Sequence, residues 1–161
     1  IVPMVELTRD YPIAVRFIEE MPFNGEGSHY PSLNWTHRRI VQHITSHYTT
    51  LQKLKDPPFS TSSNYQVPGY RGSLGVIAAF SRTFCGTCNR IRVTAQGTLK
   101  TCLYDDGVLD IKSMMRSDLS DEEISNELLN AFGSRPKDGF EAEHRRREGA
   151  PVSESMSTIG G

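Results

Sequence analysis

The alternation of apolar and polar residues predicts a β-strand near the start of the chain. Residues 13–21 read IAVRFIEEM, and apolar side chains fall on both faces of this extended segment apart from Arg16. A strand that is apolar on both faces is typical of a parallel sheet covered on both sides. We therefore expect a strand buried on both faces. A long loop rich in Pro, Gly, Ser and Asn should follow over residues 22–34.

An amphipathic helix is predicted next, from Trp35 or Thr36 to about Leu54. Apolar residues recur at helical spacing on one stripe, namely Ile40, Val41, Ile44, Tyr48 and Leu51. Asn34 or Thr36 can accept backbone N–H groups as the N-cap. The prolines at 57 and 58 cannot continue the helical hydrogen bonds, so the helix should end before them.

The middle of the chain has the pattern of short strands joined by turns. Residues 65–81 suggest a short strand, a Pro-Gly turn and a second strand over Leu74 to Phe80. Residues 90–103 then read as two strands around a turn at Gln96-Gly97. Because side chains alternate along a strand, Arg90 and Arg92 should share one face of this hairpin.

A second helix is predicted at residues 120–133. It opens with a capping box from Ser120 to Glu123, carries Ile124, Leu128 and Phe132 as an apolar stripe, and stops at Gly133. The segment 134–155 is charged and has few apolar residues, so we expect a surface extension or mobile tail.

Composition and net charge indicate which general class of protein this chain belongs to. The chain has 161 residues, of which 37% are hydrophobic, enough for a modest core in one domain or part of a larger one. Because its first residue is Ile rather than Met, we expect a fragment. The net charge of −1 gives no global attraction to nucleic acid or to an acidic membrane. No apolar run long enough to span a bilayer and no signal peptide are visible, which favours a soluble, cytoplasmic protein.

All three cysteines lie in one short stretch, FCGTCNRIRVTAQGTLKTC. Cys85, Cys88 and Cys102 are spaced C-x2-C-x13-C, and the predicted hairpin would bring the third thiol back beside the first two. An odd number of clustered cysteines is a poor disulfide framework and more often indicates metal or redox chemistry. Two metal sites are compatible with this pattern.

One is a structural zinc site, which normally needs four ligands and would take a histidine as the fourth. The candidates are His29, His37, His43, His47 and His144, none of them near the cysteines in sequence. The other is a [4Fe-4S] cluster, which is held by thiolates. With three thiolates one iron keeps an open position for substrate, and this matches the cysteine count.

Several basic side chains could bind an anion near such a site. Arg82, Arg90, Arg92 and Lys100 lie close to the cysteines in sequence. The planar guanidinium suits bidentate contacts to phosphate or to a guanine edge, although an arginine on an exposed strand face needs no ligand. Arg16 lies in a strand predicted to be buried, where a salt bridge or a substrate phosphate would be its partner. Met21, at the end of that strand, is by default a core residue.

Three blocks resemble one family of enzymes. RFIEEMPFNG, then FCGTCNRIRVTAQGTLKTCLY, and finally MSTIGG are similar in sequence and order to the C-terminal part of the MoaA family, radical S-adenosylmethionine enzymes also called GTP 3',8-cyclases. This resemblance implies an α/β fold: the last parallel strand of an incomplete TIM-like barrel, with an extension of antiparallel strands and helices that carries an iron-sulfur site. It divides the chain into barrel residues 1–55, a cluster- and substrate-binding region 56–135, and a polar extension with its tail, 136–161.

The same resemblance implies roles for individual residues. Cys85, Cys88 and Cys102 would hold the [4Fe-4S] cluster that binds GTP. GTP contacts fall on Arg16 and on Arg90, Ile91 and Arg92, and an S-adenosylmethionine contact falls on Met21. Gly160 and Gly161 would reach into the active site and be needed for turnover. In the implied reaction, a radical from S-adenosylmethionine removes a ribose 3' hydrogen of GTP, and that carbon closes onto C8 of guanine.

The chain departs from the family in one important respect. It has no C-x3-C-x2-C motif, which in the family holds the cluster that cleaves S-adenosylmethionine. The chain alone is therefore expected to be inactive, with GTP and the missing N-terminal half as partners. Self-association through the strand at 13–21 is a further expectation. Two other functions stay open: a zinc-stabilised binding module with a basic hairpin, and a carrier whose Gly-Gly tail resembles that of ubiquitin.

Overall fold

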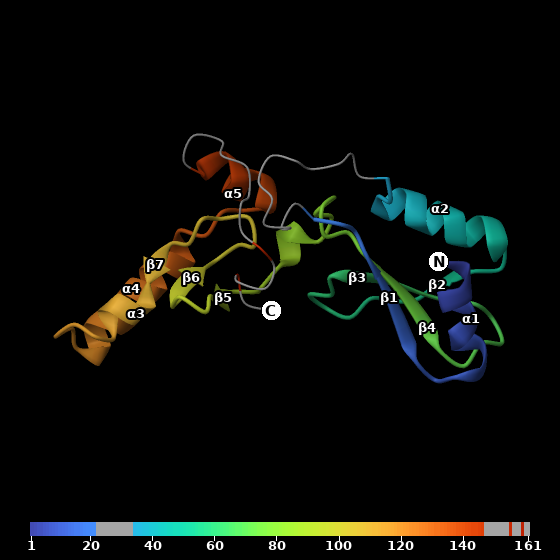
Figure 1. The fold of residues 1–161 in the computed structure, drawn as a ribbon, viewed down its shortest axis with the longest axis horizontal. Coiled ribbons are helices and arrows are strands. Elements are labelled where there is room, and N and C mark those ends of the chain that lie inside the picture. The colour runs from blue at the N-terminus through green and yellow to red at the C-terminus, as the bar shows by residue number, and fades with distance from the viewer. Residues whose placement is uncertain (22–33, 147–154, 156–158, 160–161) are drawn as a thin grey trace. The chain divides into compact units, whose positions relative to one another are not determined.

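The computed structural model describes residues 1–21 and 34–146, together with Ser155 and Ile159 (Figure 1). The predicted loop over residues 22–34 and the Gly-Gly end therefore lie almost wholly outside the described residues. The chain forms two compact units. The described residues up to 88 belong to the first unit and those from 89 onward to the second.

The first unit contains a four-stranded mixed sheet in the order β1-β4-β3-β2. Its strands are β1 (Ala14–Ile18), β2 (Gln52–Lys53), β3 (Ser62–Gln66) and β4 (Ser73–Ile77). β1 pairs with β4 in parallel, with Ala14 opposite Ser73, whereas β2, β3 and β4 pair antiparallel. The predicted Pro-Gly turn joins β3 to β4, and Gly69 adopts a φ of 85°, which favours glycine.

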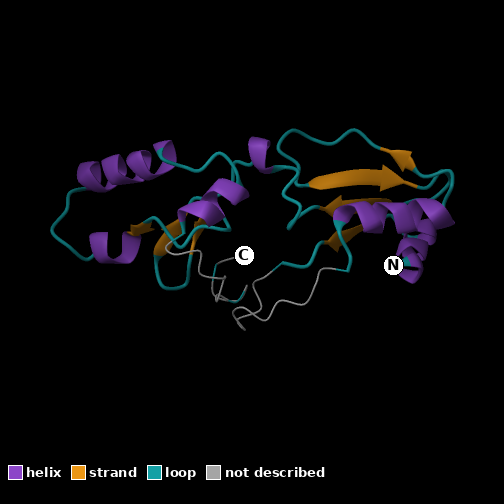
Figure 2. Ribbon diagram, turned by 90° about the horizontal axis from the view of Figure 1, so that it is seen from above, coloured by secondary structure: helices purple, strands orange, loops and turns teal. Residues whose placement is uncertain are grey.

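Two helices, α1 (Val2–Asp10) and α2 (His37–His47), cover one face of this sheet (Figure 2). The core combines Val5 of α1 and Ile40 and Ile44 of α2 with side chains from one face of the strands: Val15, Val67, Leu74 and Val76. Because side chains alternate along a strand, the residues between these core positions face away from the helices. Arg16 is one of them.

A polar contact joins the two helices of this unit. Glu6 on α1 accepts hydrogen bonds from the hydroxyl of Tyr48, which follows α2, and from that of Tyr70 at 2.9 Å. The hydrogen bond from Tyr48 holds the pKa of Glu6 below its ordinary value. Burial, together with the bond to Glu6, raises the pKa of Tyr48.

Several predictions for this unit need correction. The strand at 13–21 exists but is shorter, and it is not buried on both faces, because Ala14, Arg16 and Ile18 are exposed. α2 begins at the predicted N-cap, Thr36, whose hydroxyl accepts from the Arg39 amide. It ends at His47 rather than near Leu54, because β2 pairs with β3 instead of continuing the helix.

The second unit contains a small antiparallel sheet in the order β5-β6-β7, formed by β5 (Arg92–Val93), β6 (Thr98–Lys100) and β7 (Leu109–Asp110). The predicted hairpin is confirmed, and Gly97 in its turn has a φ of 88°. Three helices follow: α3 (Ile111–Met114), α4 (Asp121–Gly133) and α5 (Gly139–Arg145).

The second predicted helix is confirmed in α4. The Ser120 hydroxyl accepts from the Glu123 amide, and the Glu123 carboxylate accepts from the Ser120 amide at 2.8 Å, which is the predicted capping box. Ile124 and Leu128 are half-buried, but Phe132 is exposed and Ala131 is buried in its place.

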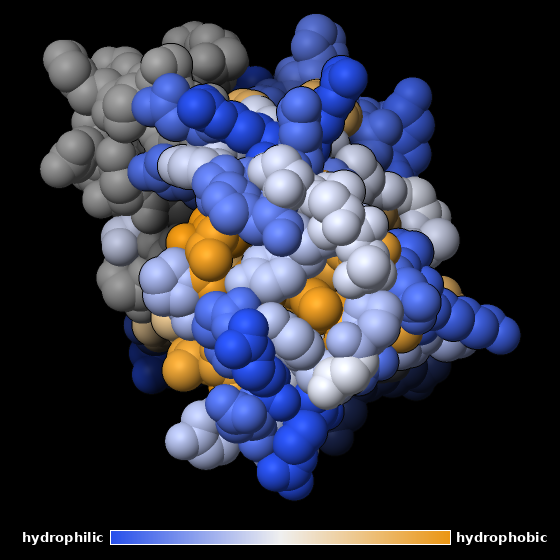
Figure 3. Space-filling view, turned by 90° about the vertical axis from the view of Figure 1, so that its right-hand side faces the viewer, coloured by the Kyte–Doolittle hydropathy of each residue, from blue (hydrophilic) through white to orange (hydrophobic). Residues whose placement is uncertain are grey.

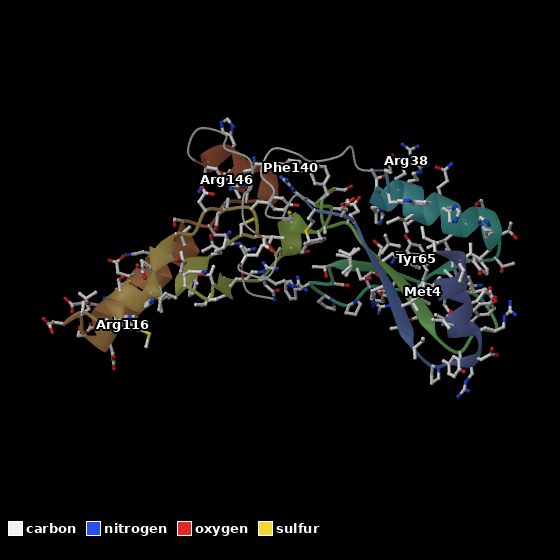
Figure 4. All side chains as sticks on the ribbon, viewed as in Figure 1. Met4, Arg38, Tyr65, Arg116, Phe140 and Arg146 are labelled. Atoms are coloured by element: carbon white, nitrogen blue, oxygen red, sulfur yellow. The ribbon has the colours of Figure 1, made fainter. Side chains whose placement is uncertain are left out.

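The charged segment after α4 is not simply a tail. α5 forms within it, because the Asp138 side chain caps the Glu141 amide and Ala142 is buried. Arg146, at the end of α5, makes an ion pair with Asp106 at 2.7 Å (Figure 4).

The surface in Figure 3 is mostly hydrophilic, with hydrophobic residues in small separate patches. Among the described residues no helix is both long and apolar enough to cross a membrane.

Candidate functional site

Two of the three cysteines lie on a single tight turn in the first unit. Cys85–Thr87 form a 3-10 helix, and the Cys88 amide donates to the Cys85 carbonyl at 3.1 Å. In a 3-10 turn the side chains at positions i and i+3 lie on the same side. Both cysteines are half-buried, so this turn presents a pair of thiols suited to chelating one metal group.

The third cysteine lies in the second unit, just after β6. Cys102 is half-buried between Thr101, which is fully buried, and Leu103. All three cysteines are thiols rather than disulfide partners. They have the donor chemistry of an iron-sulfur site, since thiolates are the normal ligands of such clusters.

The predicted meeting of the three thiols stays a prediction, because Cys102 belongs to a different unit from the other two. Within the part of the chain that the structure describes, no group of three or more His, Cys, Asp or Glu side chains is arranged to hold a metal ion.

The basic residues beside the cysteines are not equivalent. Arg90 is exposed and precedes β5, so the prediction that Arg90 and Arg92 both belong to one strand is wrong. Arg92 is half-buried, whereas Ile91 and Val93 are 49% and 53% exposed. In a strand that packs on a core, the apolar side chains would be buried and the arginine exposed. Here the burial is the reverse.

Two basic residues that are near the cysteines in sequence have buried side chains. Arg82 is 5% exposed and Lys100 is 1% exposed. Arg82 also has a φ of 55°, in the left-handed region that non-glycine residues rarely adopt. Its guanidinium carbon lies 5.7 Å from the centre of the Phe80 ring. The segment before Cys85 is therefore constrained, with its positive side chain held inside.

Arg16 lies on the sheet face opposite the helices. It is opposite Gly75 of β4, and Gly75 is opposite Asn64 of β3. A side chain at position 75 would place its Cβ 2.5 Å from Cδ of Arg16 and 2.2 Å from Oγ of Ser62. The absence of a side chain at Gly75 thus lets Arg16 extend across the sheet toward β3.

The remaining predicted residues lie at the ends of described segments. Met21 is half-buried, three residues after β1. Gly160 and Gly161 lie outside the described residues, while Ile159 beside them is fully buried.

Sequence reasoning missed two buried acids, Glu19 and Asp105, which are 2% and 8% exposed. Both accept several hydrogen bonds from segments adjacent to the cysteines. A signal was present for each of them. Glu19 has the same parity as Val15 and Phe17, which places it on the core face of the strand. Asp105 precedes Gly107 in a turn-like run, where aspartate often binds nearby backbone amides.

Comparison with known proteins adds to this geometry. The family model described as Molybdenum Cofactor Synthesis C matches residues 13–141, a range that includes all three cysteines. The chain is 38% identical over 133 residues to molybdenum cofactor biosynthesis protein 1 of Drosophila melanogaster, which covers 83% of the chain and 23% of that protein.

Two relatives carry the name of an enzyme. The chain is 32% identical over 157 residues to the GTP 3',8-cyclase of Chlorobaculum tepidum, covering 98% of the chain and 46% of the relative. It is 34% identical over 133 residues to the mitochondrial GTP 3',8-cyclase of Arabidopsis thaliana, covering 83% and 34%. The chain thus spans less than half the length of these relatives. Because the family model covers most of its residues, the chain belongs to the Molybdenum Cofactor Synthesis C family.

Proposed function

We propose that this chain is the cluster- and GTP-binding C-terminal part of a GTP 3',8-cyclase that acts in molybdenum cofactor biosynthesis. The names of the relatives from Chlorobaculum tepidum and Arabidopsis thaliana support this assignment. The chain matches less than half of each relative, so catalysis would need the remaining N-terminal part.

The observation that carries the proposal is the cysteine pattern. Cys85 and Cys88 share one 3-10 turn, and Cys102 follows the hairpin. These three thiolates would hold a [4Fe-4S] cluster. When bound, that cluster supplies an iron with an open coordination position, which acts as a Lewis acid toward the purine.

The protein residues would orient the nucleotide. Arg90 and Arg92 would bind and place GTP through charge-assisted hydrogen bonds, with Ile91 between them. Arg16 would contact the same substrate from the sheet face opposite the helices, where the residue is exposed. Holding the reacting atoms in one geometry is worth roughly 7 to 11 kcal/mol in favourable cases.

The proposed partners follow from the chain's match to less than half of the length of its relatives. S-adenosylmethionine would be bound mostly by the N-terminal half, with Met21 as a contact from this chain. Gly160 and Gly161 would reach the reacting groups. The exposed edge of β1 would adjoin the N-terminal half, and in its absence a second copy of the chain.

The test is metal analysis of the chain after anaerobic reconstitution with iron and sulfide. We expect about four iron and about four sulfide ions per chain. Replacement of Cys102 by Ser should lower both, because one of three thiolate ligands is lost. Stoichiometric zinc without sulfide would overturn the proposal in favour of a structural zinc site.

A further inference from the structure

Among the residues that the structure describes, two carboxylates are buried, and both are held mainly by backbone amides rather than by cations. Removing an ionised carboxylate from water is costly unless hydrogen bonds replace its hydration. Glu19 is in the first unit and Asp105 in the second, so each has its own surroundings. In both cases several of the donors belong to the segment that carries or leads to a cysteine.

Asp105 organises the loop that contains Cys102. Its Oδ2 accepts from the Thr101 amide at 2.9 Å, from the Thr101 hydroxyl at 3.1 Å and from the Cys102 amide at 2.8 Å. Its Oδ1 accepts from the Gly107 amide at 2.9 Å. Because the carboxylate holds the amide of Cys102 itself, it fixes the direction in which the thiol leaves the backbone.

Glu19 holds the start of the segment that leads to Cys85. Its Oε2 accepts from the amides of Phe80 at 2.9 Å and Ser81 at 2.6 Å, and its Oε1 accepts from the Ser81 hydroxyl at 2.6 Å. Oε1 also accepts from the amide of His37, the first residue of α2. The carboxylate therefore ties this segment to the end of β1 and to the start of a helix.

A series of turn hydrogen bonds extends from this anchor to the cysteines. The Arg82 amide donates to the Ala78 carbonyl at 2.7 Å, the Cys85 amide to the Arg82 carbonyl at 3.2 Å, and the Cys88 amide to the Cys85 carbonyl. The left-handed backbone of Arg82 is held only because its surroundings oppose relaxation. The preceding residue, Ser81, is restrained by the two hydrogen bonds that it donates to Glu19.

We propose that Glu19 and Asp105 are positioning residues that fix the two cysteine-bearing segments before the cluster is assembled. This inference rests on the proposed iron-sulfur site. A ligand set that is already ordered loses less conformational entropy on binding the metal, and groups outside the ligands hold it in place.

The test compares Asp105→Asn and Glu19→Gln with the unchanged protein. Each substitution keeps the size of the side chain but replaces one carboxylate oxygen by an NH2 group. That group cannot accept the hydrogen bonds of the backbone amides. The matched controls are Asp118→Asn and Glu20→Gln, which alter exposed acids outside both of these hydrogen-bond networks.

Hydrogen exchange of the metal-free chain gives the first readout. In Asp105→Asn, amides in residues 101–107 should exchange about tenfold faster, the factor expected for losing one hydrogen bond to a charged group. Amides in residues 80–88 should keep their original rates. Glu19→Gln should give the opposite pattern, and the two control variants should change neither segment.

Iron release from the reconstituted protein to a chelator gives the second readout, which a merely structural role would leave unchanged. Both variants should release iron about tenfold faster, while the controls match the unchanged protein. Release at the original rate, from an unchanged protein that does hold a cluster, would overturn the positioning role. If the unchanged protein holds no cluster, it is the proposed function that fails.

Milder variants keep the test decisive if the first pair does not fold. Thr101→Val removes one hydroxyl donor to Asp105, and Ser81→Ala removes one to Glu19. Each leaves the backbone donors in place, and each should speed iron release by a smaller factor. Release at the original rate from both would also count against the proposal.

Discussion

At the scale of the residue, the absence of a side chain at Gly75 makes room for Arg16. Arg16 lies on the sheet face away from the helices and extends over Gly75, where no side chain blocks it. Near it, Oγ of Ser62 and Oδ1 of Asn64 are buried polar atoms without a hydrogen-bond partner. The Asn64 amide nitrogen already donates to Asp56 at 2.9 Å, which fixes the direction of that oxygen. This face is therefore polar and ready for a polar ligand.

We predict that Arg16→Met lowers the affinity of the reconstituted protein for GTP about tenfold, because one charged hydrogen bond is lost while the apolar stem is kept. Arg92→Ala should act in the same direction. Arg38→Met is the control, since Arg38 is exposed on α2 (Figure 4). Calorimetric titration gives the affinities, and iron content shows whether the cluster is intact. Unchanged affinity in Arg16→Met would remove this arginine from the GTP site.

At the scale of the element, local signals fixed the starts of helices better than their ends. Thr36 and Ser120 were predictable N-caps, because a side-chain oxygen three residues before an amide is a local feature. The end of α2 depends instead on β2 pairing with β3, which no local pattern contains. α1 was not predicted at all, since it is short and has Pro3 in its first turn, and its stability depends on burial of Val5.

The same reasoning explains which parts of the site the sequence could supply. The cysteine spacing alone was enough to predict a pair of neighbouring thiols, because Cys85 and Cys88 lie on one short turn of the chain. Glu19 and Asp105 were missed because their role depends on backbone amides that fold around them. For Glu19, two of those donors, the amides of Phe80 and Ser81, lie some sixty residues away along the chain.

We predict that Ser120→Ala destabilises α4 by about 1 kcal/mol, the usual cost of removing an N-cap. Hydrogen exchange of the amides in residues 121–133 should report the change. Ser125→Ala, within the same helix and exposed, is the control and should not speed exchange. If both variants exchange alike, the capping box contributes nothing to α4.

The capping box also gives α4 a pH dependence. Hydrogen bonds from the amide and hydroxyl of Ser120 lower the pKa of Glu123. Because the pKa of Glu123 is lower in the folded protein, its ionised carboxylate stabilises the fold at any pH above the pKa that it has in the unfolded chain. This contribution is lost as the pH falls through the pKa of the folded state. In Ser120→Ala, exchange in α4 should therefore depend less on acidification.

At the scale of the whole molecule, β1 is an edge strand of its sheet in the part of the chain that the structure describes. Ile13 and Ile18 are 42% and 57% exposed there. An open edge with apolar side chains is a site where another strand can pair. The chain spans less than half the length of these relatives, and our proposal places the remaining N-terminal part at this edge.

We predict that the isolated chain self-associates and that Ile18→Lys reduces this, since a charge on an edge strand opposes pairing. Met115→Lys, in the second unit, is the control, because Met115 is 71% exposed and belongs to the end of a helix rather than to a strand. Sedimentation over a range of concentrations gives the masses. A chain that stays monomeric throughout would contradict the prediction.

The parallel pairing of β1 with β4 also sets an order of events during synthesis. Ala14 meets Ser73 only after the helix and strands between them have left the ribosome, and closing so long a loop is slow. Until then the β1 segment has no partner strand, and its apolar side chains are exposed to other nascent chains. The segment that leads to the cysteine turn reaches Glu19, at the end of β1, only with that late pairing, so this anchor is among the last parts of the first unit to form.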